Sequence, residues 1–348
     1  MTRSVRLCTA FSACLTFDLR HQSTVAALSA MNSSSSLPFP SIGWGSFGLE
    51  RSSASASLSA AIRLGYRRID CAPVYFNEDV IGDALHNILE VEKLVERKDL
   101  YIVSKLASPF HRKEHVELAV RKTLNDLRID YLDLYLIHWP VAFNFVPIDL
   151  SQRGFVDEEI DDSGDGNRID PSVSVHETWE AMEQMVEKGL VKNIGVSNFP
   201  VMLLHELLAK ARIKPLVNQC EAHPYLPNTK LMNYCKHRGV HFQAYSPLGT
   251  PGFKEDGEPT ILDDPVLQRI AESHDASVPQ VCLAWALQRN TSVVVKASSE
   301  SHLESNMKAL DVRLSKEDIH SVEELGRRNY RFFRPEEWWG EASMAVFD

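Results

Sequence analysis

From about residue 37 to the C-terminus, short β-rich runs alternate with longer amphipathic segments. The expected strands are bounded by turn-forming residues and lie at 67–70, 101–104, 131–138, 191–196, 215–219, 240–245 and 292–295. Most of the segments between them are long enough for a helix with one apolar face, at 57–64, 80–88, 113–127, 175–188, 201–211, 228–237, 265–274, 278–288 and 302–310. The loop-prone segment 38–45 can supply one further strand.

Repeated strand–helix units of this size indicate a parallel sheet. About eight such units in roughly 300 residues suit a closed (β/α)8 TIM barrel. We therefore expect an α/β fold with one barrel domain over residues 37–348. Residues 1–36 form a separate N-terminal extension in this prediction.

Polar residues recur where the expected strands end. Asp70, His138, Gln219 and Tyr245 end four of these strands, and Lys105 follows a fifth. One such residue is explained by a satisfied polar group at a strand end. Packing does not readily explain all five, and the C-terminal ends of barrel strands are where active sites form.

The composition limits the classes of function. With 348 residues and 44% hydrophobic residues, the chain can bury a full core. Its formal charge of −10 and pI of about 5.7 argue against nucleic-acid binding. No apolar run approaches the ~20 residues of a membrane span. We expect neither nucleic acid nor membrane as a partner, and a monomer or weak dimer because no heptad pattern is present.

The six cysteines are scattered and include no CxxC pair, which is typical of a reducing compartment. The extension carries Arg3, Arg6 and Arg20 and a short apolar stretch at 7–17. It is either an organelle-targeting or secretory leader, or a tail without structure, with translation from Met31 as another possibility. A cytoplasmic location is the default expectation. A long acidic insert at 141–171 is expected to be a surface loop that walls the site.

Tyr75, Lys105, Asp70 and His138 together match the needs of carbonyl reduction. Hydride addition places negative charge on the carbonyl oxygen, which must then be protonated. Tyrosine has an ordinary pKa near 10 and donates poorly at neutral pH, but a nearby ammonium such as that of Lys105 lowers this pKa. Asp70 can pair with Lys105, and a neutral His138 can orient the substrate oxygen.

Six stretches carry a family resemblance: GYRRIDCAPVYFNE (65–78), YIVSKL (101–106), YLDLYLIHWP (131–140), GLVKNIGVSNF (189–199), VNQCEAHPYL (217–226) and AYSPLG (244–249). On these motifs the chain resembles the aldo-keto reductase family from about Leu37 onward. The resemblance implies a TIM barrel that binds NAD(P)H in an extended pose. It also implies Tyr75 as the acid/base, supported by Lys105, Asp70 and His138.

The same resemblance implies the cofactor contacts. Ser197, Asn198 and Gln219 would bind the nicotinamide carboxamide, Tyr245 would stack on the ring, and Ser246 and Leu248 would lie along the pyrophosphate. Ser46 would approach the cofactor from the loop after the first strand. At the adenosine end, members usually carry a Lys-Ser-x-x-x-x-Arg pattern. This chain has KASSESH (296–302), which makes Lys296, Ser298, His302 and the retained Asn306 the expected contacts.

The substrate pocket shows a second departure. Phe47 stands where relatives commonly carry tryptophan, whereas Trp139 is kept, so the pocket floor is expected to be slightly wider. The run 138–149 resembles xylose reductases, and the tail 329–340 is similar to that of sugar-phosphate reductases such as mannose-6-phosphate reductase. Both kinds make polyols from aldoses. Arg334, together with Arg331, either binds a substrate phosphate or pairs with Glu336 or Glu337.

Two other motifs suggest different functions. GWGSFG (43–48) fits the Rossmann fingerprint, but Pro38 and Pro40 disfavour the strand that should precede it. HRKEH (111–115) fits a zinc-protease pattern, yet it lacks an evident third ligand and opens a charged helix. No metal site is expected. A non-catalytic NADPH-binding subunit and a general aldehyde-detoxifying reductase remain as alternatives to an aldose reductase.

The adenosine end predicts the cofactor preference. Lys296 can hold a 2′-phosphate, but His302 is a weaker partner than the bidentate arginine that it replaces. We expect NADPH to be preferred over NADH less strongly than in most relatives, which leaves room for NADH as a second cofactor. Turnover measured with each cofactor tests this, and equal or faster turnover with NADH would overturn it.

Overall fold

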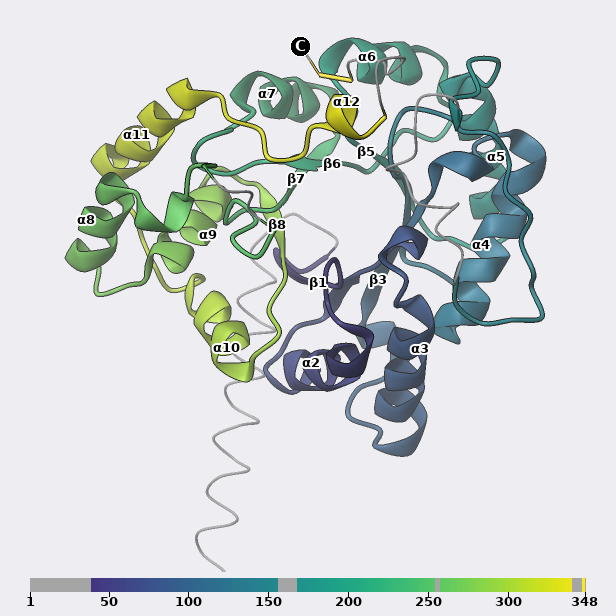
Figure 1. Ribbon diagram of the computed structural model, residues 1–348, viewed down its shortest axis with the longest axis horizontal. Helices are drawn as coiled ribbons and strands as arrows, with labels where there is room; N and C mark the ends of the chain where they lie inside the picture. Colours follow the sequence, from purple (N-terminus) through teal and green to yellow (C-terminus); the bar gives the residue numbers. More distant parts are fainter. Residues whose placement is uncertain (1–38, 156–167, 254–256, 340–345, 348) are drawn as a thin grey trace, which may run out of the picture. The chain divides into compact units, whose positions relative to one another are not determined.

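The structure is a computed structural model that describes residues 39–155, 168–253, 257–339 and 346–347. Within these residues eight parallel strands form a closed barrel, in which β1 pairs with both β2 and β8 (Figure 1). The strands are β1 Ile42–Gly45, β2 Arg68–Asp70, β3 Tyr101–Leu106, β4 Leu134–Ile137, β5 Ile194–Ser197, β6 Val217–Glu221, β7 His241–Tyr245 and β8 Ser292–Val295. The predicted (β/α)8 TIM barrel is confirmed.

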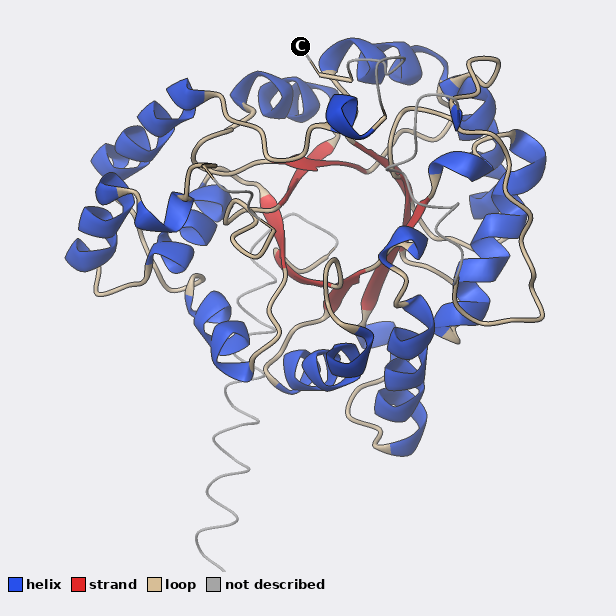
Figure 2. Ribbon diagram, viewed as in Figure 1, coloured by secondary structure: helices blue, strands red, loops and turns tan. Residues whose placement is uncertain are grey.

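Helices surround the barrel on the outside (Figure 2). The α-helices are α2 Arg51–Arg63, α3 Glu78–His86, α4 Lys113–Leu127, α5 Val175–Glu187, α6 Val201–Lys210, α7 Thr229–Arg238, α8 Pro265–Ser273, α9 Val278–Gln288, α10 Glu300–Lys308, α11 Lys316–Leu325 and α12 Pro335–Trp338. Short helical turns are η2 Pro73–Tyr75, η3 Asn87–Val91, η4 Arg97–Asp99, η5 Ser108–Phe110, η8 Ile261–Asp263 and η9 Gly326–Arg328.

Local sequence explains where several helices begin and how they pack. Ser277 and Gln280 form a capping box that starts α9, because each side chain bonds to the backbone N–H of the other residue. Asp264 caps α8 by accepting from the N–H of Val266 at 2.9 Å. Gly82 lets α3 approach α4, since a Cβ at this position would lie 2.0 Å from the Asp126 carbonyl oxygen.

Every predicted strand and helix is present, and most of them have ends that differ from the prediction by a few residues. Segment 38–45 does supply a strand, β1, and α2 begins at Arg51 rather than at residue 57. The predicted strand 131–138 is shorter, because only Leu134–Ile137 pairs as a regular strand. Helix α11 was not predicted. Val322 is its only buried side chain, so the helix contributes little to the core.

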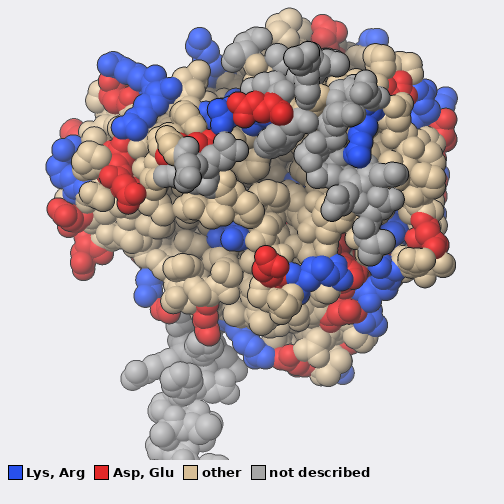
Figure 3. Space-filling model, viewed as in Figure 1, with Lys and Arg blue, Asp and Glu red and all other residues tan. Residues whose placement is uncertain are grey.

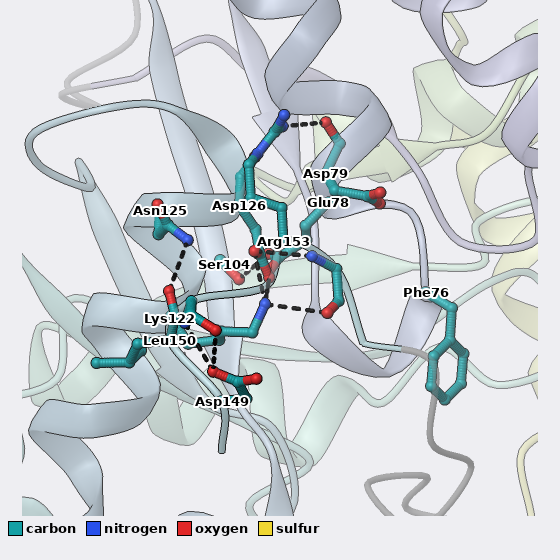
Figure 4. A network of polar contacts seen from close by, with 12 residues as sticks. Phe76, Glu78, Asp79, Ser104, Lys122, Asn125, Asp126, Asp149, Leu150 and Arg153 are labelled. Atoms are coloured by element: carbon teal, nitrogen blue, oxygen red, sulfur yellow. Dashed lines mark hydrogen bonds and ion pairs between the residues drawn. The ribbon is translucent and has the colours of Figure 1, made fainter.

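The insert after β4 is tied to α3 and α4. Lys122 and Asp126 form a buried ion pair of 2.6 Å on α4 (Figure 4). Lys122 donates to the Gly154 carbonyl oxygen at 3.1 Å, and Asp126 accepts from the Gly154 N–H at 2.9 Å. Arg153 donates to the Asp79 and Asp126 carbonyl oxygens at 2.5 and 2.8 Å. The insert therefore packs against α3 and α4. None of its described residues, 141–155 and 168–171, lines the cavity on the C-terminal face of the barrel, so it does not form the expected wall there. Its acidic run at 157–162 lies outside the described residues.

After α11 the chain returns over the C-terminal face of the barrel and leads into α12 (Figure 1, yellow). The N–H of Tyr330 bonds to the Tyr225 carbonyl oxygen at 3.0 Å, which places this tail beside the loop that follows β6. Trp339, just past α12, is buried against Trp139, with ring centroids 5.8 Å apart. The predicted extension over 1–36 lies outside the described residues, so its targeting role and its boundary stay predictions.

Candidate active site

Tyr75, Lys105 and Asp70 meet at the C-terminal ends of β2 and β3. The Lys105 ammonium forms a buried ion pair with the Asp70 carboxylate and lies 3.2 Å from Tyr75 Oη. It also donates to the Cys71 carbonyl oxygen at 3.0 Å. His138 follows β4, and its ring centroid is 5.8 Å from that of Tyr75. The structure thus brings together the four residues that the sequence singled out.

Electrostatics keep the Lys105 ammonium charged. Burial acts to lower the pKa of Lys105, but the charge of Asp70 and the interaction with Tyr75 outweigh it, so the pKa is raised above its ordinary value. The side chain is only 1% exposed. A fully desolvated cation is therefore held against the Tyr75 hydroxyl.

The turn that carries Tyr75 is held on three sides. Phe76, which follows η2, has a left-handed backbone with φ of 52°, and its carbonyl oxygen accepts from Arg51 at 2.6 Å. Asn77 donates to the Ser46 carbonyl oxygen at 2.9 Å. Glu78 accepts from Ser104, the neighbour of Lys105, at 2.6 Å. These bonds join the Tyr75 turn to β1 and β3, which supports a strained conformation at Phe76.

A cavity of about 620 Å³ opens from this group across the C-terminal face. Charged side chains gather around the periphery of that face, and its middle is formed mainly by other residues (Figure 3). The predicted site residues that line the cavity are Phe47, Asp70, Tyr75, His138, Trp139, Ser197, Asn198, Gln219, Tyr245, Ser246, Leu248, Lys296, Ser298, His302 and Asn306. Lys105 lies behind Asp70 and Tyr75, and Ser46 is fully buried beside the cavity.

The amide groups in the cavity bond to one another. Tyr245 Oη donates to Asn198 Oδ1 at 2.9 Å, and Asn198 Nδ2 donates to the His138 carbonyl oxygen at 3.0 Å. Gln219 Nε2 donates to Asp70 Oδ2 at 2.7 Å, a contact that the sequence did not suggest. Paired amide donors and acceptors next to an aromatic ring suit a nicotinamide carboxamide and its ring. The residues present therefore fit the cofactor that the motifs imply.

Arg334 does not line the cavity. Its guanidinium pairs with Glu337 at 3.2 Å, one of the two glutamates expected as an alternative partner. It also pairs with Glu258 at 3.1 Å, which the sequence did not suggest. Arg331 lies 3.6 Å from Glu221 and does not line the cavity either. The expected contact with a substrate phosphate stays a prediction.

Two aromatic residues of the cavity are among those that the sequence analysis missed. Phe333, in the tail, and Phe253, in the loop after β7, both line the cavity and contact the ring of Phe47, with centroids 5.8 and 5.1 Å apart. The tail was expected to cover the pocket, but nothing local to the chain marks which residue points inward. The Phe-Phe pair within a polar segment was the available signal.

The two alternative motifs form other structures. Gly43 and Gly45 lie within barrel strand β1, so the Rossmann fingerprint does not correspond to a Rossmann fold. His115 stacks on Phe145, with ring centroids 3.7 Å apart. In the described part of the chain no group of three or more His, Cys, Asp or Glu residues could hold a metal ion. Cys71, Cys220, Cys235 and Cys282 are buried free thiols.

Comparison with known proteins agrees with this geometry. The model of the aldo/keto reductase family matches residues 41–327. The chain belongs to the aldo/keto reductase family. The NADPH-dependent D-xylose reductase of Meyerozyma guilliermondii is 39% identical over 307 residues, which cover 86% of this chain and 94% of that protein. Aldo-keto reductase family 1 member A1 of Rattus norvegicus is 39% identical over 298 residues, or 85% and 88% of the two chains.

Solved structures of this family are also similar. The aldose reductase from Schistosoma japonicum matches with a TM-score of 0.74 and 38% identity over 85% of this chain and 91% of that one. The aldose reductase from Giardia lamblia matches with a TM-score of 0.76 and 36% identity over 88% and 98%. Among the residues described, no helix is long and apolar enough to cross a membrane.

Glu78 predicts how stability depends on pH. Burial raises its pKa from 4.5 to about 8, so the folded protein keeps a proton that the unfolded chain releases. The free energy of unfolding should therefore fall as pH rises from about 4.5 to about 8. Glu78→Gln keeps an acceptor for Ser104 and removes this loss. The free energy of unfolding is measured in urea at pH 5 and at pH 8. Between these pH values, the free energy of unfolding of the variant relative to that of the wild type should rise by about 2 kcal/mol or more.

Glu114 provides the matched control, because it is an exposed glutamate on α4. Glu114→Gln should leave the pH profile parallel to that of the wild type. Parallel profiles for Glu78→Gln as well would show that Glu78 is already ionised in the folded protein.

Proposed function

We propose that this protein reduces the carbonyl group of an aldose to an alcohol with NADPH as the cofactor. The observation that carries the proposal is the 3.2 Å contact between Lys105 Nζ and Tyr75 Oη, with Asp70 paired to the same ammonium. A site that only binds has no use for a buried cation against a tyrosine hydroxyl. The named activity of the xylose and aldose reductases described above supports the choice of substrate class.

Tyr75 is the proton donor in this mechanism. When bound, NADPH supplies the hydride that reduces the carbonyl carbon. Tyr75 gives its proton to the carbonyl oxygen, and the Lys105 ammonium stabilises the phenolate that remains. Asp70 holds Lys105 in place, and His138 donates a hydrogen bond that orients the carbonyl oxygen.

The cavity has side chains suited to each part of the cofactor. Ser197, Asn198 and Gln219 would bind the carboxamide, and Tyr245 would stack on the ring. The remaining contacts would be Ser46, Ser246 and Leu248 along the pyrophosphate and Lys296, Ser298, His302 and Asn306 at the adenosine end. NADH would be a second, poorer cofactor because His302 replaces the usual arginine.

The cavity wall favours a second candidate substrate class. Phe47, Trp139 and Phe333 present aromatic surface near Tyr75. Such a wall suits small aromatic or apolar aldehydes and would make the protein a general aldehyde-detoxifying reductase.

To bind a sugar phosphate, Arg334 would have to leave Glu258 and Glu337, the two glutamates with which it pairs. We therefore favour the free aldose over its phosphate.

Tyr75→Phe should abolish reduction without loss of NADPH binding. The purified full chain is assayed for NADPH oxidation with xylose, glucose 6-phosphate, mannose 6-phosphate and a simple aromatic aldehyde. Loss of the proton donor should lower turnover by about a hundredfold or more. An unchanged rate in the variant would exclude Tyr75 as the donor. A wild-type protein that binds NADPH but turns over none of these substrates would instead be a non-catalytic binding subunit.

Arg334→Ala tests phosphate recognition on its own. If Arg334 binds phosphate, kcat/KM for glucose 6-phosphate should be about tenfold or more lower in the variant than in the wild type. The value of kcat/KM for xylose should be nearly the same in both proteins. Measuring both substrates on the same protein preparation separates this effect from general loss of activity. An equal effect on the two sugars would assign Arg334 to holding the tail.

A further inference from the structure

One wall of the cavity belongs to the C-terminal tail. Phe333 lines the cavity, and its ring lies 5.4 Å from that of Tyr245 and 5.8 Å from that of Phe47, measured between centroids. No regular strand or helix carries Phe333, because it lies between η9 and α12. Its position therefore depends on whatever holds the tail against the barrel.

The tail backbone is bonded to a buried carboxylate at the end of β6. Glu221 Oε1 accepts from the N–H of Phe332 at 2.8 Å, and Oε2 accepts from the N–H of Phe333 at 3.1 Å. Arg331 Nη1 lies 3.6 Å from the same Oε2, and His223 Nε2 lies 2.8 Å from Oε1. The Glu221 side chain is completely buried. Hydrogen bonds and a cation must offset the cost of burying this charge.

Other ion pairs hold the tail only through side chains. Arg328 pairs with Asp264 at 3.0 Å, and Arg334 pairs with Glu258 at 3.1 Å. The two arginine side chains are 47% and 31% exposed, and long, partly solvated side chains can keep such pairs while the backbone shifts. Glu221 differs because it bonds to two consecutive backbone N–H groups, which fixes the register of the tail at Phe333.

We propose that Glu221 is a positioning residue that sets which substrates fit the cavity. By holding the backbone of Phe332 and Phe333, it keeps the Phe333 ring against Phe47 and Tyr245. The cavity then admits slender aldehydes and excludes bulky ones at that wall. The proposed selectivity rests on the carbonyl-reducing function proposed above. The contact of Glu221 with the N–H groups of Phe332 and Phe333 does not depend on that function.

Hydrogen exchange tests the contact without any substrate. In Glu221→Gln the amide NH2 group faces one of the two backbone N–H groups, so one bond is lost and a donor meets a donor. The N–H groups of Phe332 and Phe333 should exchange about tenfold faster or more than in the wild type. Glu258→Gln is the matched control, since Glu258 bonds to the tail through Tyr330 and Arg334 side chains, and exchange should stay within about twofold of wild type.

Kinetics at saturating NADPH test the selectivity. The ratio of kcat/KM for a bulky aromatic aldehyde to that for a three-carbon aldehyde should rise about tenfold in Glu221→Gln, mainly through KM. Phe333→Ala should raise the same ratio. In the variant that carries both substitutions, the ratio should rise little further, because both substitutions change the same wall of the cavity. Glu258→Gln should leave the ratio near the wild-type value.

The results distinguish failure of the role proposed for Glu221 from failure of the proposed carbonyl reduction. Unchanged exchange at Phe332 and Phe333 in Glu221→Gln, or an equal change of selectivity in Glu258→Gln, would overturn the role of Glu221. If the wild type reduces neither aldehyde, the proposed function fails, and the exchange data still decide whether Glu221 holds the tail. If Glu221→Gln does not fold by circular dichroism, Glu221→Asp replaces it, because the shorter carboxylate cannot reach both N–H groups.

Discussion

A lysine ammonium with only 1% of its surface exposed is stable in this barrel because Asp70 neutralises it. Without that carboxylate, desolvation would drive Lys105 toward its neutral form, and the charge beside Tyr75 would be lost. The same aspartate accepts from Gln219 of β6 on its other oxygen. Asp70 therefore connects the proton-donor side of the cavity to the amide groups proposed to hold the nicotinamide. The arrangement requires strands from opposite parts of the chain to end at one level, which a closed parallel barrel provides.

Buried carboxylates serve different purposes in different places around this site. Asp70 pairs with a cation, whereas no cationic side chain that the structure describes bonds to Glu78 directly. Burial raises the pKa of Glu78 to about 8, although the Ser104 hydroxyl donates to it, so Glu78 keeps its proton at neutral pH. Glu221 accepts backbone N–H groups and lies near Arg331. The difference follows from the donors that face each group, since a carboxylate ionises in a protein interior only where donors or cations replace water.

The rim of the barrel carries two long segments, the insert after β4 and the C-terminal tail. The insert is fastened by Gly154 and Arg153 to α3 and α4, and the tail is fastened by Glu221 to β6. The sequence of a loop on a rigid scaffold can change without disturbing the barrel, and in TIM barrels such loops build the active site. Phe47 and Phe333 meet there from the two ends of the chain.

The barrel and the centre of its site could be predicted from the amino-acid sequence. Strand and helix periods depend on neighbours within a few residues, and Asp70 and Tyr75 share one short motif with a recognisable pattern. Three contacts could be found only in the folded chain: Glu221 bonds to Phe332, 111 residues later, Gln219 bonds to Asp70 across 149 residues, and Arg334 bonds to Glu258. These contacts depend on which side chains face each other after the barrel has closed. No local period records that, because the same tail sequence could place either phenylalanine over the cavity.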